Sequence, residues 1–465
     1  MASVLPNVDL AKATAIATVD ANAEAFRETN RAIWGYAEPS LQEFQSAELL
    51  AKLLERHGFT VERGVAGMPT AFVATWGAGG PLIGVMAEYD ALPGLSQAAA
   101  PERRVLVPGG YGHGCGHSVF GTASAFAAIA AKEAAERAGL QGRIRCYGCP
   151  AEEILVGKVY MVRDGVFDGA DAILAWHPSD KTGADFISTK AMVSVRFTFA
   201  GVAAHASTAP HRGRSALDAV ELMNVGVNYM REHVKEDARI HYVITDGGQQ
   251  PNVVPPRASV WYYVRADRHG DVEAYLAWVD QIAEAAAMMS QTKLVERKLD
   301  TDCHEQIPSR VLAEAIDRNL RQVGLPPFDD ADREFAAKIR ASVSDAPDGP
   351  PLQTDFEAIP AEPRLVPGSS DVGDVSWHVP VGHLSATTHA YGIPVHTWQV
   401  TACIGTPIGE KGGMVAAKAL ACTVVDLLAD PDLRQAARAD WAERRGSGPY
   451  TSVIPPDQPP PLPKA

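Results

Sequence analysis

The sequence has little of what would mark a secreted, membrane-bound or disulfide-held protein. No run is apolar enough to span a membrane, and residues 1–9 lack the basic and then apolar stretches of a secretory signal. Six cysteines in 465 residues are too few for a disulfide scaffold. Cys146 and Cys149 have the spacing of a redox motif, but they lie in a strand pattern, and we interpret both as core thiols. These features predict a cytoplasmic protein.

Positive charge is also scarce. The chain carries 42 Lys and Arg against 56 Asp and Glu, a formal net charge of -14. This balance argues against nucleic acid or an anionic membrane as the main partner, although a local basic pocket remains compatible with it. With 46% hydrophobic and 21% charged residues, the composition is that of a globular protein. The length exceeds one typical domain, so we expect more than one core.

The densest group of metal-binding side chains lies in the stretch YGHGCGHS at 111–118. His113, Cys115 and His117 alternate there with glycines, which let the backbone turn sharply. Thiolate and neutral imidazole are ligands for zinc-like ions. The apolar run that follows predicts a buried helix, and polar groups at its mouth are costly unless they bind something. An incidental glycine-rich turn is the alternative, and for His113 a hydrogen bond within the turn explains the residue equally well.

Two adjacent carboxylates, Glu152 and Glu153, follow a predicted buried strand at 143–149. On a regular strand they would point to opposite faces, whereas in a turn one can bind a metal while its neighbour reaches a bound water. The alternative is a pair of exposed acids at the start of a helix near 157–164, where the helix dipole favours them. Beside the Cys/His cluster, the metal interpretation is the stronger one.

Further candidate ligands follow other apolar runs. His177 comes directly after the strand at 171–176, His396 after a short run, and Asp90 after the strand at 82–86. Open α/β sheets place their ligands at such carboxyl ends. The predicted ligand set exceeds that of a single zinc site and indicates two divalent ions, zinc or manganese with cobalt as a third option: Cys115, His117, Glu153, His177 and His396. Glu152 beside them would act as the proton carrier in metal-assisted amide hydrolysis.

Alternating helix and strand patterns predict an α/β fold with a central, mostly parallel sheet flanked by helices, as in zinc peptidases. From 188 to 302 the pattern changes to strand, helix, strand, strand, helix, strand, the order of a ferredoxin-like α+β domain. We therefore predict one catalytic domain in two parts, 1–187 and 303–440, interrupted by an inserted domain at 188–302. Residues 441–465 form a proline-rich tail for which we expect no packed role.

Several short blocks, in this order, resemble metallopeptidase family 20, the two-metal amidohydrolases: DALP at 90–93, CGH at 115–117, PAEE at 150–153 and GVAAHA at 201–206. The aminobenzoyl-glutamate utilisation branch is similar also at 112–117, 368–375 and 394–399. The auxin-conjugate branch usually has Asp where this chain has Ser118, which separates it from that branch's substrates.

The resemblance implies a role for each site residue. Cys115 would be the shared ligand, His117 and Glu153 would complete one metal site, and His177 and His396 would hold the other. Glu152 would be the general base and acid, and Asp90 would orient a ligand. The inserted domain would act as lid and dimer contact, so a homodimer is implied. From that domain, His205 would reach the partner's active site and steady the oxyanion, while Asn252 and Arg265 would lie near the substrate.

The predicted function is hydrolysis of an N-acyl or N-aroyl amino acid, with aminobenzoyl-glutamate as the lead example. A dipeptidase, or a detoxifying amidase on another acyl amino acid, is the alternative within enzymes. A catalytically inactive metal-binding scaffold is another, although it would have no need for Glu152. A hydrolase with Cys115 as nucleophile would stay active after chelation. We assign four further histidines to structure or solvent: His211, His378, His383 and His389.

Overall fold

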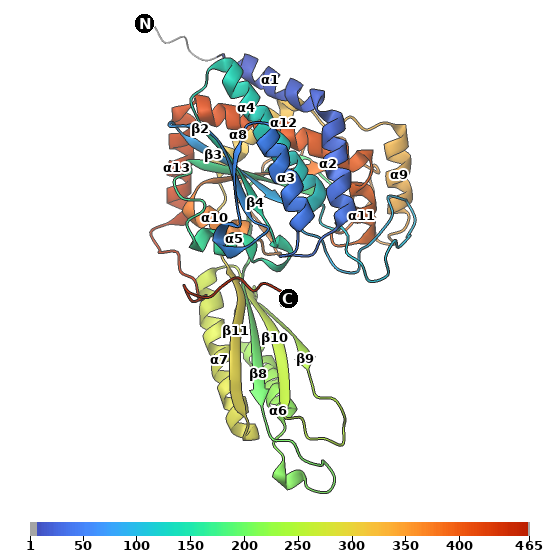
Figure 1. Cartoon of the computed structure of the whole chain (residues 1–465), viewed down its shortest axis with the longest axis vertical. Coiled ribbons are helices and arrows are strands. Elements are labelled where there is room, and N and C mark those ends of the chain that lie inside the picture. The colour runs from blue at the N-terminus through green and yellow to red at the C-terminus, as the bar shows by residue number, and fades with distance from the viewer. Residues whose placement is uncertain (1–6, 464–465) are drawn as a thin grey trace.

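Two large sheets divide the chain between a body and an arm that projects from it (Figure 1). The computed structural model describes residues 7–463. Residues 1–6 and 464–465 lie outside the described residues. The prediction about a secretory signal concerned residues 1–9, so most of that segment is among them. We use "arm" for the segment from the start of β8 at 191 to the end of β11 at 303. The predicted domain limits at 188 and 302 fall within a few residues of these ends.

The body contains a seven-stranded sheet with the order β1-β2-β4-β3-β5-β13-β6. Its strands are β1 Thr60–Arg63, β2 Phe72–Ala78, β3 Leu82–Glu88, β4 Gly142–Cys149, β5 Ala172–Ser179, β6 Gly183–Asp185 and β13 Val381–Thr387. The central strands β4, β3, β5 and β13 are parallel, but the pairs β1–β2, β2–β4 and β13–β6 are antiparallel. The predicted α/β fold is therefore confirmed, and the sheet is mixed, with antiparallel pairs on both sides of its parallel centre. A connection as short as that between β5 and β6 can only reverse the direction of the chain, so β6 runs antiparallel to the central strands.

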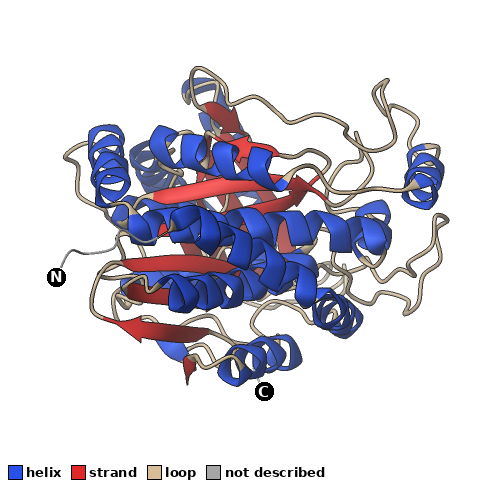
Figure 2. Ribbon diagram, turned by 90° about the horizontal axis from the view of Figure 1, so that it is seen from above, coloured by secondary structure: helices blue, strands red, loops and turns tan. Residues whose placement is uncertain are grey.

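Helices cover both faces of this sheet (Figure 2). Strand β3 is buried on both sides, as its continuous apolar sequence predicts: Ile83 and Val85 belong to one core, and Leu82 and Met86 to the other. The body helices are α1 Val8–Ala21, α2 Ala23–Tyr36, α3 Phe44–Arg56, α4 His117–Ala138, α5 Gly157–Arg163, α8 Arg310–Val323, α9 Asp330–Arg340, α10 Val372–His378, α11 Trp398–Ile404, α12 Pro407–Ala429 and α13 Pro431–Arg445.

Helix α12 is long and apolar enough, by length and composition, to cross a membrane, which the sequence analysis did not recognise. In the fold, 78% of its apolar window is buried inside the protein. It packs against α4, α1 and α8 and belongs to the larger core of the body. Its apolar sequence is thus that of a helix surrounded by other helices.

The arm has the predicted element order and a core of its own. Its antiparallel sheet has the order β11-β8-β10-β9 and packs against two helices. The elements are β8 Ala191–Ala200, α6 Ala216–Met230, β9 Arg239–Asp246, β10 Arg257–Ala266, α7 His269–Ser290 and β11 Lys293–Cys303. A short parallel pair, β7 Ile187–Thr189 with β12 Arg364–Val366, lies at the base of the arm. Strand β9 is an edge strand and is largely exposed.

The proline-rich tail has a packed position, so the expectation that it lacks one was wrong. After α13 it runs along the junction between body and arm, where Figure 1 places the C-terminus. The Tyr450 hydroxyl donates to Asp374 at 2.8 Å, and Ile454 is 5% exposed. Gln458 Nε2 lies 2.9 Å from both the Tyr160 hydroxyl of the body and the Leu299 carbonyl of the arm. Prolines keep such a segment extended, and an extended chain can follow a groove that a helix could not.

Candidate metal centre and active site

The glycine-rich turn places His117 at the first position of α4. Gly116 has φ +84°, a left-handed conformation that favours glycine, and it caps the helix. His117 is fully buried, and its Nδ1 lies 2.8 Å from Oδ1 of Asp90. A carboxylate that accepts from one ring nitrogen orients the other toward a metal. Within residues 7–463 no group makes a hydrogen bond with Nε2 of His117, so this buried nitrogen is free to be a ligand.

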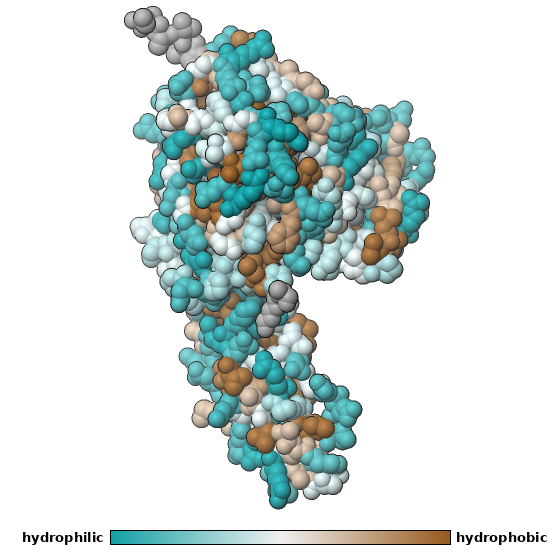
Figure 3. Space-filling view, viewed as in Figure 1, coloured by the Kyte–Doolittle hydropathy of each residue, from teal (hydrophilic) through white to brown (hydrophobic). Residues whose placement is uncertain are grey.

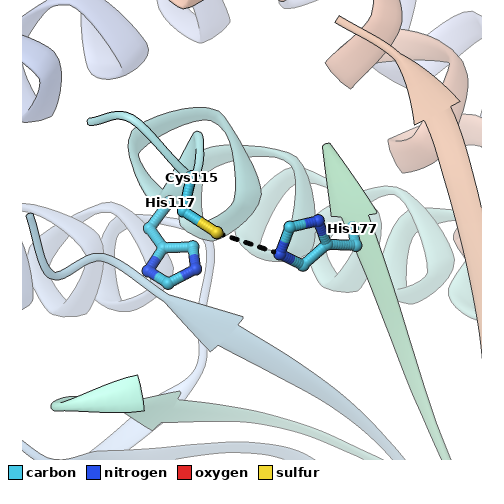
Figure 4. Close-up of side chains that lie close together, drawn as sticks. All are labelled: Cys115, His117 and His177. Carbon is cyan, nitrogen blue, oxygen red and sulfur yellow. Dashed lines mark hydrogen bonds between the residues drawn. The ribbon is translucent and has the colours of Figure 1, made fainter. Parts of the chain in front are cut away.

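His177 approaches the same point from β5 (Figure 4). Its Nε2 lies 3.4 Å from Sγ of Cys115, while its Nδ1 lies 2.7 Å from the Pro178 carbonyl oxygen. The carbonyl can only accept, so Nδ1 carries the proton and Nε2 is the unprotonated ligand atom. One ligand atom each from Cys115, His117 and His177 lie within 4.8 Å of one another. This geometry suits one metal ion.

A second group shares Cys115. It combines the thiol with Glu153 and His396, again with ligand atoms within 4.8 Å of one another. Nε2 of His396 lies 3.5 Å from Oε2 of Glu153. The resemblance paired His117 with Glu153 and His177 with His396; the geometry instead pairs His117 with His177 and Glu153 with His396. The difference arises because His177 on β5 and His117 on α4 face each other across the thiol, which spacing in sequence cannot show.

Glu152 and Glu153 begin a single turn of 3-10 helix, Glu152–Ile154, so they lie neither in a regular strand nor at the start of α5. Ala151 before them has φ +58°, a strained conformation for a residue with a Cβ. The buried Glu43 holds this turn, since its Oε1 accepts from the Ala151 amide at 2.9 Å. Oε1 of Glu152 accepts from the Ser370 hydroxyl at 2.9 Å, and Asp90 Oδ2 accepts from the Glu153 amide at 2.9 Å.

Below the ligands lies a buried ion cluster that the sequence analysis did not identify. The Lys158 ammonium is fully buried and lies 2.7 Å from Glu88 Oε1 and 2.5 Å from Asp371 Oδ1. The other Glu88 oxygen, Oε2, is 3.4 Å from Nε2 of His117. A lysine at the start of a helix is usually exposed to solvent, so the position of Lys158 in the sequence did not indicate a buried ion pair. The motif at 368–375 was noted only as part of the resemblance.

The charges of this centre fit bound cations. Five carboxylates of this centre are buried or nearly buried. The Lys158 ammonium contacts two of them, Glu88 and Asp371, and the others are Asp90, Glu152 and Glu153. Such an excess of like charge is unfavourable unless protons or cations neutralise it. Burial and the neighbouring charge of Glu153 raise the pKa of the Cys115 thiol above its ordinary value. A metal ion that binds the sulfur would hold it as the thiolate.

The pKa directions differ among the groups of this centre: although burial opposes both shifts, neighbouring charges raise the pKa of His117 and the hydrogen bond from His117 lowers that of Asp90. Burial and the charge of Glu88 raise the pKa of Glu152 from 4.5 to about 7, and burial raises that of Glu153 well above its ordinary value. Burial and the charge of His117 lower the pKa of His177 to about 3, which keeps this imidazole neutral and able to bind a metal. A general base with a pKa near 7 is suited to neutral pH.

A cavity of about 450 Å³ opens over these residues. The body contributes Cys115, Glu152, Glu153, His177 and His396 to its lining, and the arm contributes Tyr263 and Arg265. The guanidinium of Arg265 lies over the Tyr263 ring at 5.5 Å, and its buried Nε makes no hydrogen bond within the described part of the chain. Arg265 is therefore a cation available to an anionic group in the cavity.

His205 and Asn252 lie elsewhere, in exposed loops of the arm. Their segments are adjacent, since the Ala206 amide donates to the Asn252 carbonyl at 3.0 Å. Neither residue lines the 450 Å³ cavity. The loop from 201 to 213 forms the end of the arm far from the body in Figure 1. The structure therefore does not place His205 or Asn252 at the cavity of their own chain.

Two other histidine assignments were also tested by the geometry. His113 is buried with Nε2 3.0 Å from the Ile33 carbonyl oxygen, and it belongs to neither group of candidate ligands around Cys115, so its role is structural. Cys146 and Cys149 are buried free thiols in β4, as predicted. His383, assigned to structure or solvent, instead lines the active-site cavity beside Asp185. Its sequence position gave no signal because β6, which carries Asp185, is three residues long.

Sequence and structure comparisons place this arrangement in a family. Residues 187–288 match the M20 peptidase dimerisation domain. Over 462 residues the chain is 40% identical to a subunit of p-aminobenzoyl-glutamate hydrolase from Escherichia coli K12, covering 94% of this chain and 96% of the relative. The chain belongs to the M20 peptidase family. It is also 27% identical over 448 residues to the Xaa-Arg dipeptidase of Mus musculus, with 93% of each chain covered.

A solved structure supports the fold. A dinuclear metal-binding M20 peptidase of Bacillus subtilis aligns with a TM-score of 0.56 and 19% identity, covering 88% of this chain and 99% of its own. The M20 chain described here is accordingly a metal-dependent amidohydrolase, and its predicted enzyme class is confirmed. The residues that surround Cys115 provide this M20 member with ligand sets for a two-metal centre.

Proposed function

We propose that the protein hydrolyses the amide bond of N-acyl or N-aroyl amino acids, with p-aminobenzoyl-glutamate as the reference substrate. The observation that carries the proposal is one cavity in which two ligand groups share Cys115, the carboxylate of Glu152 lies beside them, and an arginine faces them. The Escherichia coli relative, named as a p-aminobenzoyl-glutamate hydrolase, supports the choice of substrate.

The metal site would use the two groups described above, with Cys115 common to both. The thiolate and imidazole donors favour zinc or manganese, with cobalt as a third option, over calcium or magnesium. When bound, two such ions supply Lewis-acid polarisation of the amide carbonyl and acidify water. The raised pKa of the Cys115 thiol argues against its use as a free nucleophile.

Glu152 would be the general base and acid. Its Oε1 is held by the Ser370 hydroxyl, and its Oε2 lies 3.8 Å from Nε2 of His117. It lines the cavity, so it can accept a proton from the attacking water and deliver that proton to the leaving amine nitrogen. Arg265 would bind the carboxylate of the released amino acid, since a guanidinium and a carboxylate form paired hydrogen bonds.

The active site would be completed by a second copy of the chain. His205 lies in an exposed loop of the arm, away from its own cavity, so it would serve the cavity of a partner, with Asn252 beside it. The arm has the surface for such a contact: Figure 3 shows apolar groups on it, and Val225, Tyr229 and Val243 are 51%, 74% and 53% exposed. We therefore propose a homodimer through the arm.

Six buried free thiols suit the reducing cytoplasm, where we place the enzyme.

A substrate panel tests this function. Purified protein, stripped with chelator and reloaded with manganese or zinc, would be assayed with p-aminobenzoyl-glutamate, other acyl-glutamates, acyl-aspartates and dipeptides. We expect turnover of acyl-glutamates only after metal is restored. Preference for dipeptides would favour the alternative of a dipeptidase, and preference for other acyl amino acids that of a detoxifying amidase. Metal binding without turnover of any substrate would favour an inactive scaffold.

A further inference from the structure

A second polar cluster, formed by Asp185, His383 and Ser385, lines the active-site cavity on a different strand pair from the metal ligands. Nδ1 of His383 and the Ser385 hydroxyl each lie 2.8 Å from Oδ2 of Asp185. Asp185 on β6 is directly opposite His383 on β13 in the antiparallel register, so both side chains are on one face of the sheet. The cluster is therefore held by the sheet rather than by a mobile loop.

The cluster leaves one hydrogen-bond acceptor unused. Oδ2 of Asp185 receives both donors, and no residue between 7 and 463 donates to Oδ1. The side chains of Asp185 and His383 are only 11% and 10% exposed. Burial raises the pKa of Asp185, but the hydrogen bonds from His383 and Ser385 and the charge of Arg364 outweigh it and lower the pKa below its ordinary value. A carboxylate that stays ionised with one free oxygen is a strong acceptor for a ligand N–H.

The sheet register gives the position of this acceptor relative to the metal ligands. Ser385 on β13 pairs with His177 on β5, and β6 is the next strand after β13. Two strand spacings of about 4.8 Å put Asp185 about 10 Å across the sheet from the strand that carries His177. A planar aromatic acyl group with a substituent in the para position can bridge such a distance when its carbonyl lies at the metal ligands.

We propose that Asp185, held by His383 and Ser385, forms the subsite for the acyl end of the substrate and accepts a hydrogen bond from an N–H group at its far end. The inference rests on the proposed function, because it takes the scissile carbonyl to lie at the metal ligands. Arg265, on the arm side of the cavity, would bind the carboxylate of the amino acid and so direct the acyl end toward Asp185, whose own charge is partly balanced by the neighbouring Arg364. An aromatic amine is the acyl substituent that fits.

The test compares two ligands that differ only in this amino group. Binding of p-aminobenzoyl-glutamate and of benzoyl-glutamate would be measured by calorimetry on metal-loaded Glu152→Gln protein, with and without Asp185→Asn. In Asp185→Asn the side-chain amide oxygen accepts from His383, so the amide NH₂ points into the cavity. There it faces the amino group of the ligand, which is also a donor, and no hydrogen bond can form. We expect the amino compound to bind about 10-fold more tightly than the benzoyl compound, and this preference to vanish in Asp185→Asn. Affinity for benzoyl-glutamate should not change.

Glu357→Gln is the matched control, because Glu357 lines the adjoining 250 Å³ cavity but not the active-site cavity. It should leave the preference intact. Equal affinities in the parent protein, or a preference that persists in Asp185→Asn, would overturn the subsite. Weaker binding of the dipeptide alanyl-arginine in Asp185→Asn would also overturn the subsite. The Asp185 carboxylate would then bind the arginine side chain of a dipeptide and not the acyl end of the substrate. Turnover by the wild type is measured separately. A difference in affinity between the two ligands without hydrolysis would refute the proposed function alone. Hydrolysis without such a difference would refute the subsite alone.

Discussion

The body and the arm contribute to one active site in different ways. The body supplies buried groups whose positions are fixed by strand ends, such as His177 on β5, and by carboxylates such as Asp90 behind them. The arm supplies Arg265 from within its sheet but carries His205 in an exposed loop far from the cavity. The candidate metal ligands therefore lie together in one chain, whereas the proposed role of His205 in catalysis needs the arm of a second. Variants in the body and in the arm can separate these two contributions.

The largest effect is expected from the body. Glu152→Gln removes the proton carrier but none of the candidate ligands grouped around Cys115, so we expect kcat to fall about 10²–10⁴-fold while both metal ions remain. Steady-state kinetics and metal analysis of the same sample measure the two quantities. Glu133→Gln, at an exposed acid of α4, is the control and should behave as wild type. Normal turnover in Glu152→Gln would remove the assignment of the base.

A loss of activity is also expected from a change in the arm, because His205 is proposed to act in the active site of the partner. His205→Ala should lower kcat about 10²–10³-fold, as for other groups that stabilise an oxyanion, with metal content unchanged. His211→Ala, at an exposed histidine of the same loop, should not.

Mixing the two inactive variants distinguishes action in the partner from action within one chain. A heterodimer of His205→Ala with Glu152→Gln has one site with both groups intact, so activity should reappear after the protomers exchange. Failure to recover any activity, with exchange of protomers shown by mass, would place His205 outside catalysis.

A smaller effect should follow from loosening the base without removing it. Ser370→Ala deletes the hydroxyl that donates to Glu152 Oε1, and we expect kcat to fall about 10-fold with KM nearly unchanged, the value of one hydrogen bond to a charged group. Ser370→Thr keeps a hydroxyl and should recover most of the rate. Equal losses in both variants would indicate a packing defect in this segment instead.

The metal-free body should lose stability as pH rises. Glu152 and Glu43 have folded pKa values raised from 4.5 to about 7 and about 8, so protonation favours the folded state. Their stabilisation is complete below pH 4.5 and is lost as pH rises through these values; for Glu152 it is on the order of 3 kcal/mol. The Tm of chelated protein should thus fall between pH 5 and 8, and bound metal should cancel the decline. A Tm of the chelated protein that rises over this range would refute the sign.

The candidate ligands could be selected from sequence because each lies in a short motif or directly after an apolar strand. Their grouping could not, since it depends on how α4 and β5 face each other across Cys115. Lys158 and Asp185 escaped detection for a similar reason. Each has its partner on a distant segment, Lys158 with Asp371 and Asp185 with His383, and spacing in sequence does not show that these segments meet. The antiparallel pairs β2–β4 and β13–β6 were not predicted for the same reason, since each joins strands that are far apart in the sequence.

The measurement that tests the central claim most directly is anomalous diffraction from crystals of the zinc-loaded protein. Two peaks should appear, each at about 2.3 Å from Sγ of Cys115, one also bound by His117 and His177 and the other by Glu153 and His396. A single peak, or two peaks of which only one contacts this sulfur, would contradict the shared-thiolate centre.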